Sequence, residues 1–372
     1  MPSYSGIGAK FMNEALPESM RMPDAYRKLE IYPGYACSRS CRFCFVSRDD
    51  RVRFAAHIPF RKLCETVYKA YIRGSRSLSV LGGEPTLYPH LLELLAFARK
   101  TGYSSAVLFS NGFRLSDRDY VGKLAETGLK AVHFNLPSCE SDAFDYLTRS
   151  KDGLQKAVKA LDNLAELKIP VIAVCVINKS NYNKLPGYAD FYMRHGVSAF
   201  MLHYTKLAGC LDPDIPENRE NLEIVIPASK AAEGIRQMTD FCVSKQFVPP
   251  FVDITQPCLL GRYATRLIDF TQFHNDPESE LMIQPDIDMS ETWDLSYKGR
   301  GKPPSCARCI WKGKCYGIDG NYIKMFGTDE FVPVISDPGA YYEGLPEDFV
   351  KKLLKPLPEL VEERYRELNG NE

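Results

Sequence analysis

Residues 29–44, Leu-Glu-Ile-Tyr-Pro-Gly-Tyr-Ala-Cys-Ser-Arg-Ser-Cys-Arg-Phe-Cys, lead from an apolar run directly into a loop with three cysteines. Cys37, Cys41 and Cys44 place three thiolates on one loop, where they can bind three irons of a cubane and leave the fourth iron without a protein ligand. Zinc also accepts thiolates, but its structural sites take four protein ligands, and the nearest histidine along the chain, His57, is distant. The loop therefore favours an iron–sulfur cluster with an open iron.

The apolar run before this loop is the first of six predicted strands. Each strand is short and rich in Val, Ile, Phe or Tyr, and most follow a Gly or Pro. The predicted strands are Leu29–Tyr35, Leu78–Leu81, Ser105–Phe109, Ala131–Leu136, Val171–Ile177 and Ala199–Tyr204.

Segments with helical periodicity follow these strands, and Asp152 stands at the predicted N-cap of one of them. Alternating strands and helices predict parallel strands with right-handed crossovers, either in a doubly wound sheet or in part of a barrel. Ligands of both folds bind at the carboxyl ends of the strands. The predicted helices are Phe60–Arg73, His90–Lys100, Asp117–Glu126, Gly153–Leu167, Lys184–Arg194 and Ala228–Ser244.

Composition limits the classes of function. The 372 residues include 47 basic and 47 acidic side chains, so no basic surplus indicates nucleic acid or an anionic membrane. The start lacks the apolar run of a secretory signal, and no later run reaches bilayer length. We therefore expect a cytoplasmic protein, in which twelve cysteines indicate metal binding or catalysis rather than disulfides.

Two motifs resemble the signatures of the radical S-adenosylmethionine (radical SAM) superfamily. The first is the CxxxCxxC loop, with Phe43 before its last cysteine. The second, Gly82-Gly83-Glu84-Pro85 at the end of the second strand, resembles the family's GGEP segment, which holds the methionine end of SAM. Its glycines allow backbone to approach the ligand closely, and the Glu84 carboxylate can accept from the ammonium group.

The resemblance extends to other strand ends and implies further SAM contacts. Ser110 lies in the polar turn after the third strand, and Arg149 lies where related enzymes place an arginine for the SAM carboxylate. Asn135 and Ser138 occupy positions that often contact ribose, and Asn178 is near the usual adenine region. For each of these, a plain turn or a solvated charge is the alternative interpretation.

The resemblance implies an α/β fold, the partial (β/α)6 barrel of this family. It also implies that SAM binds the open iron, accepts an electron and breaks its C5′–S bond. The resulting 5′-deoxyadenosyl radical would remove a hydrogen atom from the substrate, in a site that excludes water.

A second cysteine block, Cys306-x-x-Cys309-x5-Cys315, resembles the SPASM and Twitch extensions that bind auxiliary [4Fe–4S] clusters. Cys258 lies where those extensions place an earlier ligand, and four cysteines suffice for one closed cluster. A full SPASM block continues with another cysteine, but Asp319 stands there, so we expect a single Twitch-like cluster. The alternatives are a zinc knuckle on the same cysteines, or a core Cys258 that leaves an auxiliary iron open.

These motifs predict a domain order. We expect an N-terminal segment 1–28, a radical SAM core 29–247, a Twitch-like domain 248–330 and a helical tail 331–372 with helix near Pro346–Leu368. Residues Asn275–Lys302, rich in Pro, Asp and Ser, have a loop-and-hairpin composition.

No general base is identified from the sequence. Cys175, Cys64 and Cys242 are predicted to be packing residues, whereas Cys139 and Cys210 follow strands and can face the active site. His203 and Tyr204 end the sixth strand on opposite faces, so at most one of them points inward.

The substrate predicted from the resemblance is a ribosomally made peptide, with a sugar, alcohol or nucleotide as the alternative. An electron donor such as flavodoxin or ferredoxin is expected. The molybdenum-cofactor cyclases resemble this chain less, since they end in Gly-Gly and this chain ends Asn-Gly-Asn-Glu. A zinc-stabilised binding protein without catalytic activity is the alternative from another class.

Overall fold

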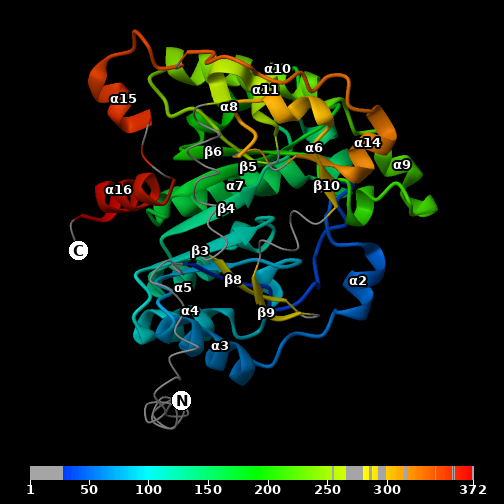
Figure 1. The fold of residues 1–372 in the computed structure, drawn as a ribbon. Coiled ribbons are helices and arrows are strands. Elements are labelled where there is room, and N and C mark those ends of the chain that lie inside the picture. The colour runs from blue at the N-terminus through cyan, green and yellow to red at the C-terminus, as the bar shows by residue number, and fades with distance from the viewer. Residues whose placement is uncertain are drawn as a thin grey trace.

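The computed structural model describes residues 28–264, 280–284, 287–291 and 299–370, apart from single positions 254, 314, 316, 340, 354 and 356. Within this part of the chain, a curved sheet runs through the molecule and helices cover its outer side (Figure 1). The predicted N-terminal segment 1–28 lies outside the described residues except for Lys28.

All six predicted strands are present, and each pairs in parallel with the next one along the chain. The first ends at Ile31 rather than Tyr35, because Pro33 has no N–H to donate to a neighbouring strand. The strands are β1 (Lys28–Ile31), β2 (Ser77–Val80), β3 (Ser105–Ser110), β4 (Ala131–Asn135), β5 (Val171–Ile177) and β6 (Ala199–Tyr204).

The six predicted helices are also present, close to their expected bounds. They connect the strands and pack their apolar stripes on the outer face of the sheet. They are α3 (Phe60–Ile72), α4 (Leu91–Thr101), α5 (Arg118–Glu126), α7 (Gly153–Glu166), α8 (Leu185–Arg194) and α10 (Ala228–Ser244).

The predicted N-cap position of α7 is confirmed, but the Asp152 side chain does not cap the helix. Asp152 occupies the N-cap position, but its φ is 57° and its side chain makes no capping hydrogen bond. Instead, the Asp145 carboxylate accepts from the backbone N–H of Asp152 at 2.8 Å and of Gly153 at 2.7 Å. The acceptor for these backbone N–H groups at the start of α7 therefore comes from α6 (Ser141–Thr148), the preceding helix.

The sheet is wider than the six strands expected. Its order is β7-β6-β5-β4-β3-β2-β1-β8-β9, with β7 (Phe251–Asp253) parallel to β6 and β8 (Glu280–Gln284) parallel to β1. β9 (Ile287–Glu291) forms an antiparallel hairpin with β8, within the segment that was predicted to contain a hairpin. The core is thus a half-barrel of seven parallel strands, extended at the β1 edge. The boundary at residue 247 stays a prediction, although strands beyond it join the core sheet.

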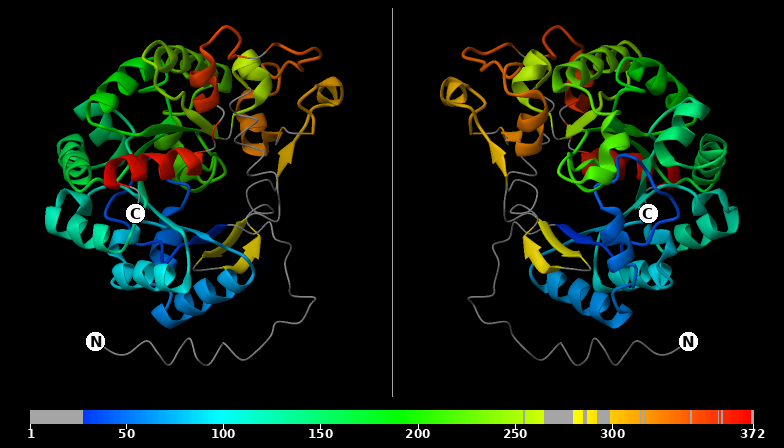
Figure 2. Two further views of the ribbon diagram at one scale, coloured as in Figure 1. Left: turned by 90° about the vertical axis from the view of Figure 1, so that its left-hand side faces the viewer. Right: turned by 90° about the vertical axis from the view of Figure 1, so that its right-hand side faces the viewer.

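The inner face of the half-barrel has its own apolar cluster. Helices form a crescent around the convex side of the sheet, and the red helix near the C-terminus lies at one end of the strands (Figure 2). Leu357 and Leu360 of α16 (Leu357–Asn369) pack with Ala131, Ile172 and Ala199, which lie near the amino ends of their strands. Burying each leucine contributes about 1.5–3 kcal/mol. This helix therefore closes the bottom of the half-barrel and leaves the carboxyl ends of the strands for a site.

A small C-terminal unit packs against the top of the core. It contains the two-stranded sheet of β10 (Arg300–Gly301) and β11 (Ile318–Asp319), followed by α14 (Gly320–Phe326). Asn321 of α14 donates to the backbone oxygen of Leu207 at 3.0 Å, which ties this unit to the segment after β6. The predicted helical tail consists of α15 (Glu347–Leu353) and α16. Among the described residues, no helix has the length and apolarity needed to cross a membrane.

Candidate functional site

The CxxxCxxC loop follows β1 and brings three thiols together. Cys37, Cys41 and Cys44 are half-buried and remain free thiols. Burial raises the pKa of Cys41, and the neighbouring Cys44 and Cys37 raise it further. Burial also raises the pKa of Cys44 to about 11, although the Arg51 guanidinium lowers it. Iron would have to deprotonate these thiols on binding, as bound metal ions do.

Two N–H groups point at the sulfur of Cys37. The backbone N–H of Arg39 donates at 3.5 Å, and the Asn111 side-chain amide donates at 3.6 Å. Hydrogen bonds of this type are found on the sulfurs of iron–sulfur clusters and help to set their potentials. The donor set therefore fits a cluster on this loop.

Among the described residues, no three His, Cys, Asp or Glu side chains converge as one bound metal ion would require. A cubane does not need this convergence, because each thiolate binds a different iron.

The glycine-rich segment after β2 packs directly on the start of the cysteine loop. The N–H of Gly83 donates to the Gly34 oxygen at 3.0 Å, and the N–H of Glu84 donates to the Ala36 oxygen at 2.8 Å. A Cβ on Gly83 would lie 2.3 Å from the Ala36 and Tyr35 oxygens. Pro85 then begins a short 3-10 helix, η2 (Pro85–Leu87). The two motifs of the resemblance thus form a single backbone unit.

Glu84 is buried in this unit and is held by protein donors. One carboxylate oxygen accepts from the Thr86 hydroxyl at 2.7 Å and from the Ser110 hydroxyl at 2.8 Å. The other accepts from the Asn111 N–H at 2.7 Å. Burial raises the pKa of Glu84, and these hydrogen bonds oppose the rise. Its carboxylate therefore links the ends of β2 and β3, and a contact with the SAM ammonium group stays a prediction.

The remaining predicted SAM contacts differ in how well they are placed. The Oδ1 atom of Asn135 is buried without a hydrogen-bond partner among the described residues, which suits an acceptor for ribose hydroxyls. Ser138 accepts from the Glu140 N–H at 3.0 Å. Phe43 packs, partly buried, against the main core.

Asn178 and Arg149 have protein partners in the structure. Asn178 is fully buried, and its side chain bonds to Ser180 N and Val176 O within its own turn. Arg149 donates to Asn221 at 2.9 Å and lies 3.6 Å from a Glu220 carboxylate oxygen. Their roles toward SAM stay predictions.

A polar layer lies inside the half-barrel above the apolar floor. Tyr204 faces outward and donates to the Ile226 oxygen at 2.6 Å, so of the last two residues of β6 only His203 points inward. His203 Nδ1 lies 3.1 Å from a carboxylate oxygen of Asp253 on β7. His133 on β4 stacks on Phe109 with ring centroids 4.2 Å apart. Burial lowers the pKa of His133 to about 3, so it is neutral.

The second cysteine block forms the wall of a cavity. Cys258, Cys306, Cys309 and Cys315 all line it, together with the apolar side chains of Trp311, Ile318 and Phe331. Burial raises the pKa of Cys258 to about 12, and the thiols of Cys315, Cys309 and Cys306 raise it further, in that order. The cysteine predicted to complete the set therefore lies with the other three.

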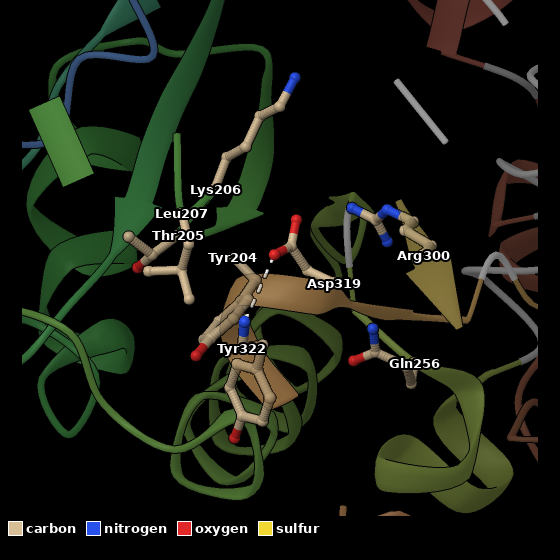
Figure 3. A pocket seen from close by; sticks show the side chains of 8 residues that line it. All are labelled: Tyr204, Thr205, Lys206, Leu207, Gln256, Arg300, Asp319 and Tyr322. Atoms are coloured by element: carbon tan, nitrogen blue, oxygen red, sulfur yellow. Dashed lines mark hydrogen bonds between the residues drawn. The ribbon is translucent and has the colours of Figure 1, made fainter. Parts of the chain in front are cut away.

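A neighbouring cavity lies at the carboxyl end of β6 (Figure 3). Tyr204 and Tyr322 line one side, with ring centroids 6.0 Å apart, and Arg300 and Asp319 belong to the small C-terminal sheet. Gln256 lines both this cavity and the cysteine-lined one. The two cavities are therefore adjacent, and both lie where the C-terminal unit meets the barrel mouth.

Two arginines near the cluster loop, Arg39 and Arg51, were not identified from the sequence, whereas Cys210 was predicted to be able to face the active site. Arg39 is buried inside the loop, Arg51 donates to the Cys210 sulfur at 3.5 Å, and the Cys210 N–H donates to the Cys44 oxygen at 2.8 Å. Cys210 is thus beside the cluster loop, as an active-site position would require, but it is almost fully buried. Nothing local in the sequence indicates which arginines the fold brings to this loop.

The chain matches the radical SAM superfamily over residues 31–192. It is 29% identical over 180 residues to a probable GTP 3′,8-cyclase of Sulfurisphaera tokodaii, a match that covers 47% of this chain and 54% of that protein. It is 25% identical over 174 residues to the sporulation killing factor maturation protein SkfB of Bacillus subtilis, covering 47% and 41% of the two chains. The chain thus spans about half the length of the curated relatives it matches.

Two solved structures share the fold over most of the chain. SuiB of Streptococcus suis, solved with its precursor peptide SuiA, superposes with a TM-score of 0.62 at 18% identity, covering 84% of this chain and 76% of SuiB. The enzyme anSMEcpe, solved with AdoMet and a peptide, superposes with a TM-score of 0.57 at 15% identity, covering 91% and 98%. Residues 31–192, which carry the cysteine and glycine motifs on one half-barrel edge, match the radical SAM superfamily, whose members use a [4Fe–4S] cluster and SAM.

Proposed function

We propose that this chain is a radical SAM enzyme that oxidatively modifies a peptide. Cys37, Cys41 and Cys44 would hold the SAM-binding cluster, and the four cysteines of the second block, including Cys258, would hold one auxiliary cluster. The observation that carries the proposal is the adjacency of two cavities at the barrel mouth. One is lined by the second cysteine block and the other by the carboxyl end of β6.

This adjacency suits a net oxidation. A substrate that loses a hydrogen atom at the barrel mouth retains an unpaired electron, and an electron acceptor next to the site can take it. When bound, the SAM cluster and SAM supply the oxidant that removes the hydrogen atom. The protein's part is to bind, to orient and to exclude water, and the Gly83 contact and the apolar floor of the barrel serve these roles.

A net oxidation of this kind also releases a proton, and His203 is placed to accept it. With Nδ1 bonded to Asp253, Nε2 would remain to act as the base. The imidazolium formed would be stabilised by the same carboxylate. His133 would stay neutral, because burial lowers its pKa to about 3 and the nearby His203 lowers it further.

A peptide is favoured as substrate by the two fold neighbours solved with peptides and by the similarity to a peptide maturation protein. A nucleotide is the second candidate, since the cyclase from Sulfurisphaera tokodaii is a relative of similar coverage. The likeness to SuiB and anSMEcpe covers 84% and 91% of this chain, more than the core alone, which favours the peptide.

An electron donor such as flavodoxin or ferredoxin would approach at α2 (Arg48–Arg53), which follows the cluster loop and buries no residue. Phe45 and Val52 are 46% and 80% exposed there, and Arg48 and Arg53 are exposed beside them. Asp49 is also exposed on this helix, so the two arginines leave a net positive charge beside the apolar centre, which fits an acidic partner protein.

We expect co-expression with a small open reading frame adjacent to the gene to yield a peptide lighter by two hydrogen atoms per modification, as measured by mass spectrometry. The His203→Gln variant should form less product while still cleaving SAM, because hydrogen removal does not need the base. Turnover of GTP or another small molecule, with every neighbouring peptide unmodified, would contradict the peptide and favour the second candidate.

The auxiliary cluster has a separate test at Cys258. We expect Cys258→Ala to lose or destabilise this cluster, because only three thiolates would remain for four irons. The EPR response of the other cluster to SAM should be unchanged. Cys242→Ala, which removes a fully buried thiol on α10, is the matched control and should keep all its iron. Unchanged iron and spectra in Cys258→Ala would make Cys258 a packing residue.

A further inference from the structure

Arg39 is a buried cation in the middle of the cluster loop. Its side chain is 6% exposed, and Nε, Nη1 and Nη2 have no hydrogen-bond partner among the described residues. Arginine keeps its charge in proteins, and leaving a guanidinium buried and unpaired is strongly destabilising. A guanidinium held in this way indicates that a group bound by the protein accepts its hydrogen bonds.

The surroundings of Arg39 limit what this acceptor is. The charged groups that act on it are, in order, the Cys41 thiol, the Glu84 carboxylate, the Cys37 thiol and Asp145. Glu84 already accepts from Thr86, Ser110 and Asn111, and Asp145 caps α7. On the remaining side, the Phe144 ring centroid lies 5.3 Å from the guanidinium carbon. Of these groups, the thiols of Cys41 and Cys37 belong to the cluster loop, so this arrangement favours sulfur as the acceptor.

Arg42, three residues later in the same loop, gives a direct contrast. It is also buried, but its Nε donates to the Tyr146 oxygen at 3.0 Å and its Nη2 lies 2.7 Å from a Glu220 carboxylate oxygen. Its guanidinium carbon lies 4.1 Å from the Tyr146 ring centroid. Arg42 therefore has a carboxylate partner and lacks a partner only at Nη1, whereas all three side-chain nitrogens of Arg39 lack partners among the described residues.

We propose that Arg39 donates hydrogen bonds to the sulfur atoms of the cluster held by Cys37, Cys41 and Cys44, and that it raises the reduction potential of this cluster. The inference rests on the proposed function, because it needs the cluster on these cysteines. A reduced cluster carries one more negative charge than an oxidised one. A fixed cation and N–H donors beside it therefore stabilise the reduced form, and both are established determinants of cluster potential.

The test is an EPR-monitored redox titration of the reconstituted full-length protein without SAM, following the signal that SAM perturbs when it is added afterwards. We expect Arg39→Gln to lower the ratio of reduced to oxidised cluster at a fixed potential at least tenfold, which is about 59 mV for one electron. Arg39→Lys keeps the charge and loses the planar guanidinium, so its ratio of reduced to oxidised cluster should lie between those of Arg39→Gln and the wild type. Arg42→Gln and Arg42→Lys remove or alter a paired cation of the same loop. Their ratios of reduced to oxidised cluster should stay within twofold of the wild-type ratio.

The outcomes separate this inference from the proposed function. A wild-type protein that takes up no [4Fe–4S] cluster would refute both. A wild-type cluster with equal potentials in the Arg39 and Arg42 variants would overturn the inference alone. An unchanged potential with weakened SAM perturbation would also overturn it, since Arg39 would then serve SAM rather than the cluster. If Arg39→Gln loses its cluster, the comparison of Arg39→Lys with Arg42→Lys decides in the same way.

Discussion

Replacing Cys37, Cys41 and Cys44 together with Ala is expected to lower the iron content of the reconstituted protein from about eight to about four per chain. The same variant should release no 5′-deoxyadenosine or methionine from SAM with dithionite, whereas the wild type should release both slowly even without substrate. The reason is that SAM binding needs an iron without a protein ligand, which only the three-cysteine loop provides. The second block of four thiols is expected to hold a closed cluster.

The control for this experiment removes a thiol without touching either loop. Cys64→Ala on α3 changes a fully buried core cysteine and should leave iron content and SAM cleavage unchanged. Iron analysis and chromatography of the SAM products measure the two effects. A wild-type value near four irons would contradict the auxiliary cluster, and zinc in place of iron would favour the binding-protein alternative. Release of S-adenosylhomocysteine alone would contradict the proposed chemistry.

The strands of the core were predictable because their signal is local. Val171–Ile177 and Ala199–Tyr204 were predicted at their observed bounds. Short apolar runs that follow a Gly or Pro are typical of buried parallel strands. β7 has three residues, too few for periodicity, and β8 pairs with β1 across about 250 positions, as in Leu29 opposite Leu281. Such pairings are decided by tertiary structure and leave no local pattern in the sequence.

The candidate site also has parts that were predictable from the sequence and parts that were not. The cysteines and the Gly82–Pro85 segment were predictable because each motif is contiguous and its chemistry needs those residue types. Contacts made between distant segments were not predictable. The capping of α7 by Asp145, and the placement of Cys210 beside Cys44, both depend on how loops from different strands pack together.

The second large effect is expected at Gly83. A Cβ there would lie 2.3 Å from the backbone oxygens of Ala36 and Tyr35, and backbone atoms held by the adjacent hydrogen bonds cannot yield as a flexible side chain would. Gly83→Ala should therefore destabilise the protein by about 1–3 kcal/mol. Because Ala36 directly precedes Cys37, the displaced loop should also lose the SAM cluster while the second cysteine block keeps its own.

Gly122→Ala is the matched control for this substitution. Gly122 lies in α5, and a Cβ there would meet no atom within 4 Å. Alanine in an open helical position should raise stability by about 0.5–1 kcal/mol, so the two Gly→Ala changes are expected to have opposite signs. Anaerobic thermal unfolding and iron analysis of both variants measure this difference. If Gly83→Ala matched Gly122→Ala in melting temperature and iron content, the packing of the glycine segment on the cysteine loop would not be the contact that shapes the SAM site. If Gly83→Ala kept its melting temperature but lost half its iron, the contact would shape the cluster loop alone and contribute little to the stability of the fold.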